Sequence, residues 1–127
     1  MYVEYNQNPA SLKIVGDCAI RALAKALNVD WEKAYLMLCS NGFAMGDLPN
    51  SNVVIASVLR QNGFKRVDMV NGCPECISVK EFAEGHPKGT YVLGTGSHLV
   101  TVIDGNYYDA WDSGDEIPAY AWRKEKR

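Results

Sequence analysis

The sequence predicts an α+β fold in which N-terminal helices pack on a C-terminal antiparallel sheet. The first two thirds of the chain show mainly capped helical segments. After Gly89, apolar and polar residues alternate between glycine-containing turns. The chain has 127 residues, of which 47% are hydrophobic, and this is enough to bury one sizeable core. We therefore expect a single domain over residues 1–127.

The first predicted helix runs from Cys18 to Leu27, within "GDCAIRALAKAL", and Asp17 is its expected N-cap. Only Arg21, Lys25 and Asn28 are polar along it, and their spacing places them in one narrow stripe. The other positions are nearly all alanine, leucine or isoleucine. This helix should therefore be mostly surrounded by protein.

Three further helices are predicted from their capping residues. They run from Trp31 to about Ser40 after the cap Asp30 and before Asn41-Gly42, from Ser51 or Asn52 to Asn62-Gly63, and from the capping box of Ser78 and Glu81 to Gly85 and Pro87. Between the last two, "FKRVDMV" predicts a strand. The expected sheet then follows in "TYVLGT", "SHLVTVI", "NYYDAWD" and "AYAWRK".

Composition and charge argue against several classes of function. The net charge of −2 shows no basic excess, so no nucleic-acid partner is expected. No apolar run approaches the roughly 20 residues that span a membrane, and the chain start lacks the pattern of a signal peptide. We expect a cytoplasmic protein without membrane contact, whose four cysteines are reduced.

Cys18 is a candidate nucleophile because it stands at the start of the first predicted helix. A reactive cysteine needs a lowered pKa, since the thiolate is the nucleophilic form. The N-terminus of a helix carries about half a positive charge, and its N–H groups can hold a developing oxyanion. Such a nucleophile also needs a base and a third group that orients the base.

His98 is the better candidate for the base among the two histidines of the chain. It opens the strand in "GTGSHLVTVI", where the small residues before it leave room for another group. His86 lies in "EGHPKG", which predicts a solvated turn. The sequence therefore favours a pair of Cys18 and His98.

The group that orients His98 should come from the strand that returns beside it, after the turn "DGN". A three-residue turn brings His98 opposite Asp112, whereas a two-residue turn at Asp104-Gly105 places Asp109 on its face. The longer turn also pairs apolar residues across the hairpin. Asp112 is therefore the favoured partner, and Asp109 is the alternative.

The order and setting of these residues resemble the papain-like cysteine peptidases. That family has a cysteine at the start of a central helix, a histidine on a later strand, and an asparagine or aspartate that ends the next strand. The segments "GDCAIRALAKAL", "EFAEGHPKGTYVL", "GSHLVTVIDG" and "YYDAWDS" are similar, more specifically, to small papain-like proteins of bacteriophages and bacteria. The resemblance covers most of the chain.

The resemblance implies a papain-like fold and a thiol hydrolase, of cysteine peptidase or amidase type, that needs no cofactor. Cys18 would be the nucleophile that forms an acyl-enzyme, His98 the general base and then acid, and Asp112 the group that fixes the imidazole tautomer. The substrate would be a peptide, an isopeptide link or a cell-wall crosslink. Trp111, judged from its place on the strand after His98, is a candidate wall of a peptide groove.

One position departs from the family pattern. Papain-like enzymes usually carry an oxyanion-hole glutamine about six residues before the cysteine, and Leu12 stands there in this chain. Gln7, Asn8 and Ser11 are nearby polar residues, but their spacing differs. This departure supports the alternative of a non-catalytic papain-like binding module that has lost turnover.

Cys73 and Cys76 form a separate C-x-x-C pair in "NGCPECISV". A structural zinc ion takes four ligands, so Cys39 and His86 would have to complete the site. A thioredoxin-like role is disfavoured, because the pair stands in an apparent loop with a proline directly after Cys73. The favoured interpretation is a structured turn with two thiols and no metal.

Overall fold

The computed structural model describes residues 1–10 and 16–125 of the chain. In these residues it is an α+β structure with four helices and six strands. The elements follow one another as β1 (Tyr2–Glu4), α1 (Cys18–Leu27), α2 (Trp31–Met45), α3 (Asn52–Gln61), β2 (Phe64–Asp68), α4 (Val79–Gly85), β3 (Thr90–Gly94), β4 (Leu99–Ile103), β5 (Asn106–Asp109) and β6 (Tyr120–Lys124). None of the described helices is long and apolar enough to cross a membrane.

The strands form one mixed sheet in the order β1-β5-β4-β3-β6-β2. The prediction of a purely antiparallel, C-terminal sheet is wrong on two points. The N-terminal strand β1 pairs in parallel with β5, and β2 joins the opposite edge although it precedes α4. Because β1 has only three residues, it offers too short an alternation to be recognised in the sequence.

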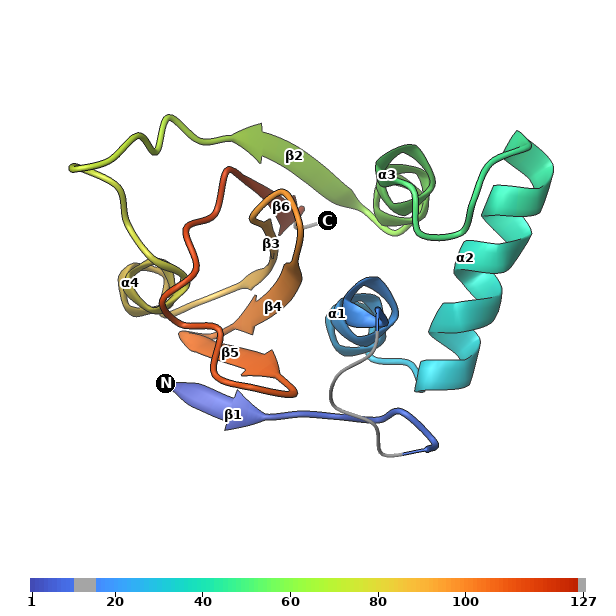
Figure 1. Cartoon of the computed structure of the whole chain (residues 1–127), viewed down its shortest axis with the longest axis horizontal. Helices are drawn as coiled ribbons and strands as arrows, with labels where there is room; N and C mark the ends of the chain where they lie inside the picture. Colours follow the sequence, from blue (N-terminus) through green and yellow to red (C-terminus); the bar gives the residue numbers. More distant parts are fainter. Residues whose placement is uncertain (11–15, 126–127) are drawn as a thin grey trace.

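Helices cover both faces of the sheet (Figure 1). The helices α1, α2 and α3 lie on one side, and α4 lies on the other. Each side has its own cluster of buried apolar side chains, because neighbouring strand residues point to opposite faces. Val92 and Trp122 face the three-helix side, whereas Leu93 and Ala121 face α4.

Helix α1 lies between the sheet and α2, whereas α3 packs on β2 and α2. The predicted bounds and burial of α1 are confirmed. Its buried apolar residues are mostly alanines, which allow neighbouring backbones to approach closely. One such approach is the hydrogen bond that Thr101 Oγ1 of β4 donates to the Ala22 carbonyl at 2.6 Å. This contact joins α1 to the strand that follows His98.

Helix α2 is longer than predicted, because it continues through Asn41-Gly42 to Met45. Gly42 does not end the helix. Instead it allows a close approach of the following loop, since a Cβ there would lie 2.8 Å from the Asp47 carbonyl oxygen. The helix ends at Gly46, which adopts the left-handed conformation with a φ of 69°.

The β4–β5 hairpin closes with a two-residue turn at Asp104-Gly105. Both residues have positive φ angles, of 49° and 84°, which is typical of an Asp-Gly turn between antiparallel strands. Val102 therefore pairs with Tyr107. The favoured three-residue register is wrong, and the alternative register is the one observed. As a result, the last residue of β5 is Asp109.

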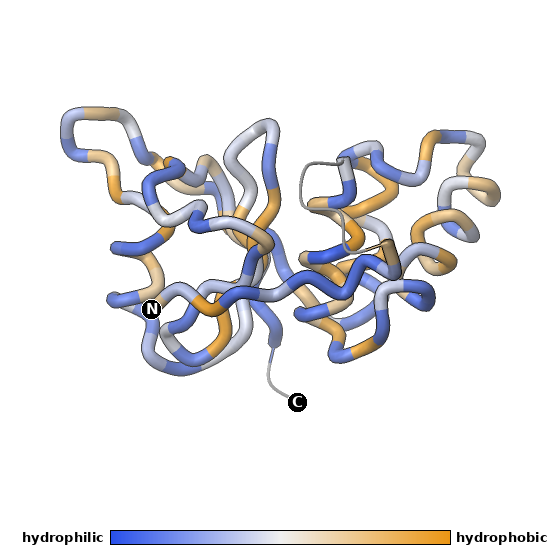
Figure 2. The backbone as a smooth tube through the Cα atoms, turned by 60° about the horizontal axis from the view of Figure 1, so that its bottom comes forward, coloured by the Kyte–Doolittle hydropathy of each residue, from blue (hydrophilic) through white to orange (hydrophobic). Residues whose placement is uncertain are grey.

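The segment after β1 runs from the sheet towards the helices (Figure 2). It is largely hydrophilic, in contrast to the hydrophobic stretch within β1. Within it, Asn8 donates from Nδ2 to Asp17 Oδ2 at 3.1 Å. The N-terminal part of the chain therefore contacts both the edge of the sheet and the start of α1.

Candidate active site

Three elements end or begin at the same place and bring the candidate residues together. Cys18 is the first residue of α1, His98 immediately precedes β4, and Asp109 ends β5. Because β4 and β5 are antiparallel neighbours, the start of one lies beside the end of the other. The predicted pair of Cys18 and His98 is found together, since both residues line one cleft and each shifts the pKa of the other.

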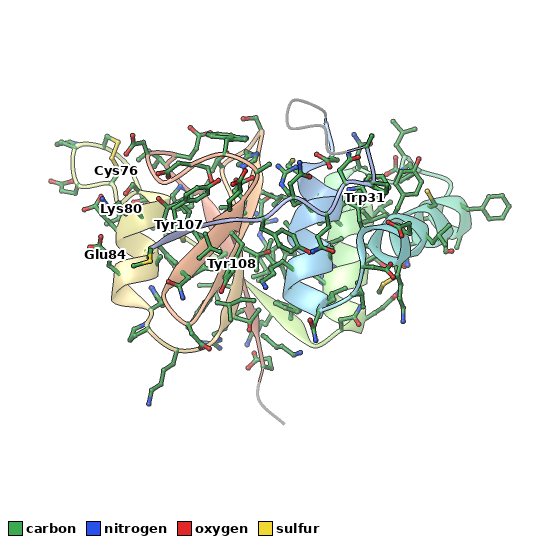
Figure 3. The ribbon with its side chains drawn as sticks, turned by 90° about the horizontal axis from the view of Figure 1, so that it is seen from below. Trp31, Cys76, Lys80, Glu84, Tyr107 and Tyr108 are labelled. Carbon is green, nitrogen blue, oxygen red and sulfur yellow. A yellow bond between two sulfur atoms is a disulfide. The ribbon has the colours of Figure 1, made fainter. Side chains whose placement is uncertain are left out.

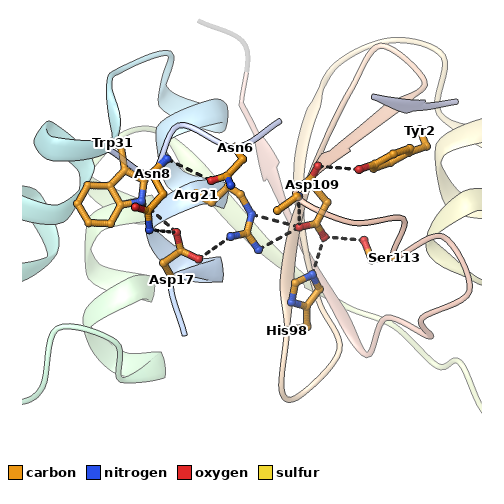
Figure 4. A network of polar contacts seen from close by, with 10 residues as sticks. Tyr2, Asn6, Asn8, Asp17, Arg21, Trp31, His98, Asp109 and Ser113 are labelled. Carbon is orange, nitrogen blue, oxygen red and sulfur yellow. Dashed lines mark hydrogen bonds and ion pairs between the residues drawn. The ribbon is translucent and has the colours of Figure 1, made fainter. Parts of the chain in front are cut away.

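Asp109 holds the imidazole of His98 through the ring nitrogen Nε2 (Figure 4). The distance from His98 Nε2 to Asp109 Oδ2 is 2.6 Å. The Asp109 residue is fully buried, and the His98 side chain is 9% exposed. With Nε2 engaged by Asp109, the other ring nitrogen, Nδ1, is left to face the thiol.

The predicted partner Asp112 does not contact His98. Its Oδ1 accepts hydrogen bonds from the Tyr107 hydroxyl at 2.5 Å and from the Gly114 N–H at 3.0 Å. These bonds lower the pKa of the exposed Asp112 carboxyl, with the Tyr107 bond as the largest cause. The physical reason for the correction is the shorter turn, which shifts β5 by one residue relative to His98.

The environment of Cys18 favours the thiolate. Burial disfavours the charged form, but hydrogen bonds to the His98 side chain and the Leu99 backbone act against it. The positive charges of His98 and Arg21 add to this effect. The net result is a pKa of Cys18 below its ordinary value, as a nucleophilic cysteine requires.

The environment of His98 favours the imidazolium. Burial alone would lower its pKa, but hydrogen bonds to Asp109 and Cys18, and the negative charges of both, raise the pKa of His98 to about 9. For Asp109, burial acts to raise the pKa. Hydrogen bonds from His98 and Ser113 outweigh burial and hold the pKa of Asp109 below its ordinary value.

Two features that hold Asp109 were missed in the sequence. Ser113 is buried and donates from Oγ to Asp109 Oδ2 at 2.6 Å. The backbone carbonyl of Asp109 accepts from the Tyr5 N–H at 2.8 Å and from the Tyr2 hydroxyl at 3.1 Å, so β1 holds the end of β5 in place. No local pattern of Ser113 indicates this contact, because it depends on the register of the sheet.

Arg21 and Asp17 extend the buried network from Asp109 to α1, and their predicted roles need correction. Arg21 was assigned to a polar stripe but is 3% exposed, and it bridges Asp17 and Asp109. Asp17 occupies the N-cap position of α1, yet its side chain makes no capping hydrogen bond and pairs with Arg21 instead. The spacing of four residues between them, on a helix that should be buried, was the available signal.

A cleft of about 260 Å³ opens beside Cys18 and His98. Its walls come from the starts of α1 and α3, from the loop before β4 and from β6, and include Asn50, Asn52 and Tyr120. Trp111 is not among the lining residues. Its half-exposed ring lies against His98 instead, with ring centroids 4.9 Å apart.

The residues considered for an oxyanion hole are placed only in part. Leu12 and Ser11 lie outside the described residues. Gln7 is exposed and does not line the cleft. Asn8 is engaged elsewhere, since its amide nitrogen binds Asp17 and its Oδ1 accepts from the Ala10 N–H.

Cys73 and Cys76 form a disulfide, so the expectation that all four cysteines are reduced is wrong for this pair. Cys18 and Cys39 are the free cysteines. The disulfide between the other two does not support the expected cytoplasmic location. Figure 3 shows Cys76 at the α4 end of the molecule, opposite the end at which Trp31 lies. Among the described residues, no group of three or more histidine, cysteine, aspartate or glutamate side chains could hold a metal ion.

Comparison with protein-family models, with curated proteins and with solved structures finds no match for this chain.

Proposed function

We propose that the chain has a papain-like fold and acts as a thiol hydrolase through Cys18, His98 and Asp109. The observation that carries the proposal is the 2.6 Å contact between His98 and the buried Asp109, on an imidazole whose other side meets Cys18. The arrangement of cysteine, histidine and acid is the one that the family resemblance implies, with Asp109 in the third position.

The reaction would proceed through an acyl-enzyme. The Cys18 thiolate attacks the carbonyl carbon of an amide or thioester, and the carbonyl π electrons move to oxygen. As the tetrahedral intermediate collapses, the bond to the leaving nitrogen or sulfur breaks and His98 protonates the leaving atom. His98 then takes a proton from water as the water oxygen attacks the acyl carbon. Cys18 departs as a thiolate beside the imidazolium, and the acid product is released.

The N–H groups of the first turn of α1 are the donors proposed for the oxyanion, because they have no partner within the helix. The cleft beside Cys18 is too small to enclose a long substrate, so the substrate would lie across it. A peptide, an isopeptide link and a cell-wall crosslink all present a suitable carbonyl group.

The first test is the pH dependence of Cys18 alkylation by iodoacetamide, mapped by mass spectrometry in wild type and in His98→Ala. Cys39 provides an internal control, and the disulfide pair stays silent without a reductant. We expect Cys18 to react well below pH 8 and to lose this advantage in the variant. Alkylation of Cys18 that follows Cys39 at every pH would contradict the proposal.

The second test is acyl transfer from p-nitrophenyl acetate. We expect an acetyl group on Cys18 that water removes, and no such adduct in Cys18→Ala. If Cys18 shows the lowered pKa but forms no hydrolysable adduct, the chain is a binding module that has lost turnover.

A further inference from the structure

Arg21 is a buried cation one helical turn after Cys18. Its Nε and Nη2 lie 3.1 and 3.0 Å from Asp109 Oδ1, and its Nη1 lies 2.6 Å from Asp17 Oδ1. A buried guanidinium is costly unless charged partners surround it. Here two carboxylates from different elements do so, one on each side.

The contact with Arg21 determines which way the Asp109 carboxylate faces. Oδ1 also accepts from the Ala110 N–H at 2.8 Å, so this oxygen is fully engaged. The planar guanidinium fork binds it in a defined orientation. Oδ2 is thereby left for His98 and Ser113, which both bind it at 2.6 Å.

Arg21 also joins the two halves of the site. It belongs to the same helix as Cys18, whereas Asp109 and His98 belong to the β4–β5 hairpin. Asp17 anchors the guanidinium from the helix side and is itself held by Asn8 and Trp31, each at 3.1 Å (Figure 4).

We propose that Arg21 is the positioning residue of this site, which orients His98 through Asp109 from the helix that carries Cys18. The nucleophile and the group that aims the base are then fixed to one rigid element, and their relative position does not depend on the hairpin alone. This inference rests on the proposed function. It is supported by the effect of the Arg21 charge, which lowers the pKa of Cys18 and of Asp109.

The proposal is tested with two substitutions of Arg21 and a matched control. Arg21→Gln removes the charge but keeps an amide donor, whereas Arg21→Lys keeps the charge and loses the planar fork. Lys25→Gln is the control, because Lys25 is a cation on the same helix whose Nζ lies over the rings of Tyr108 and Tyr5, 4.2 and 5.3 Å from their centroids. The Asp109 carboxylate is bound instead by Arg21, His98, Ser113 and the Ala110 N–H. The control reports the cost of losing a helix cation without a change at the site.

Two readouts separate positioning from a merely structural role, and neither needs turnover. Nitrogen-detected NMR of the imidazole rings reports the proton on His98 Nε2 and the charge of the ring. His86, whose Nδ1 lies 2.7 Å from the Phe82 carbonyl oxygen, is an internal reference for native structure. The second readout is the rate and pH midpoint of Cys18 alkylation.

In wild type and Lys25→Gln, we expect a fixed His98 Nε2 proton and an imidazolium that persists to about pH 9. In Arg21→Gln, that proton signal should be lost, the alkylation midpoint should rise, and the maximal rate should fall on the order of ten-fold. Arg21→Lys should keep the midpoint near that of wild type, because the charge remains. Its rate should still fall.

A folded Arg21→Gln protein with a wild-type His98 signal and alkylation curve would overturn the proposal. If that variant does not fold, Arg21→Lys decides, since unchanged readouts there contradict a role of the fork. Failure of the proposed function looks different, because acyl turnover would be absent in wild type while the effects of Arg21 on His98 and Cys18 persisted.

Discussion

At the scale of single residues, Asp109 is the group on which the polar contacts converge. Its two carboxylate oxygens and its backbone carbonyl all accept hydrogen bonds, from α1, from β1 and the residue after it, and from the segment after β5. A carboxylate that is buried and fully paired is held in one orientation. The 2.6 Å contact between Asp109 Oδ2 and His98 Nε2 therefore fixes the orientation of the imidazole as well.

Asp109→Asn should disable the pair of Cys18 and His98. An amide can present an N–H to His98 Nε2, which moves the imidazole proton to Nδ1 and so towards the thiol. The ring can then no longer act as a base towards Cys18. We expect the alkylation rate of Cys18 at pH 6 to fall on the order of a hundred-fold, measured by mass mapping against Cys39.

Asp112→Asn is the matched control for this substitution. Asp112 is exposed and binds Tyr107 and Gly114, not His98. Its variant should keep the wild-type alkylation rate. Equal losses in both variants, or a loss in Asp112→Asn alone, would show that the assignment of Asp109 is wrong.

At the scale of elements, the β4–β5 turn decides which acid meets His98. Asp-Gly is the turn signal that the sequence carries, and it outweighs the apolar pairs that the longer turn would form. The apolar pairing was a poor guide because both faces of β4 and β5 are covered, so either register buries apolar side chains. The positive φ angles at the turn settle the register locally.

Gly105→Ala should destabilise the protein by about 1 to 2 kcal/mol, because an alanine is strained at the φ of 84° that the turn requires. The measurement is the free energy of unfolding in urea. Gly72→Ala is the control, since a Cβ there meets nothing within 4 Å and no positive φ is needed. A loss at position 105 no larger than at position 72 would mean that the turn is not the one described.

The capping residues predicted the starts of α3 and α4 better than they predicted the end of α2. The capping box of Ser78 and Glu81 at α4 and the cap of Ser51 at α3 are confirmed. Both are local hydrogen bonds within one turn, so they depend only on neighbouring residues. The predicted end of α2 was wrong because Gly42 allows the following loop to pack closely against the helix. This is a tertiary contact, which a local sequence signal does not report.

At the scale of the whole molecule, the site is a chain of alternating charges from Asp17 through Arg21, Asp109 and His98 to Cys18. The raised pKa of His98 stabilises the fold at pH values below about 6.5, and this contribution is lost as the pH rises through about 9. The lowered pKa of Cys18 acts in the opposite direction, since its contribution is fully present only above the unfolded thiol pKa of about 8.5.

These two effects have opposite signs and predict a plateau of stability between about pH 6.5 and 8.5. In this range the contribution of His98 falls as the pH rises, whereas the contribution of Cys18 falls as the pH drops, so the two oppose each other. Towards lower pH the stability should decline as the thiolate of Cys18 takes up a proton. It should decline further as the pH falls below about 4, because the lowered pKa of Asp109 contributes only while its carboxylate stays ionised.

Cys18→Ala should remove the plateau. His98 then keeps a proton that the unfolded chain has lost, so the free energy of unfolding should fall above pH 6.5 by up to about 1.4 kcal/mol per pH unit. Urea unfolding at a series of pH values measures both proteins. Parallel curves for wild type and Cys18→Ala across this range would show that the thiol and the imidazole do not share a proton.

The sequence by itself determined the α+β class, the bounds of α1, and the joint placement of Cys18 and His98. Caps, a buried apolar helix and the alternation of strands are local features, and they persist whatever the rest of the chain does. The tertiary structure decided the acid, the role of Arg21 and the addition of β1. These depend on the register between β4 and β5 and on contacts between residues far apart in the chain, where a shift of one residue exchanges one carboxylate for another.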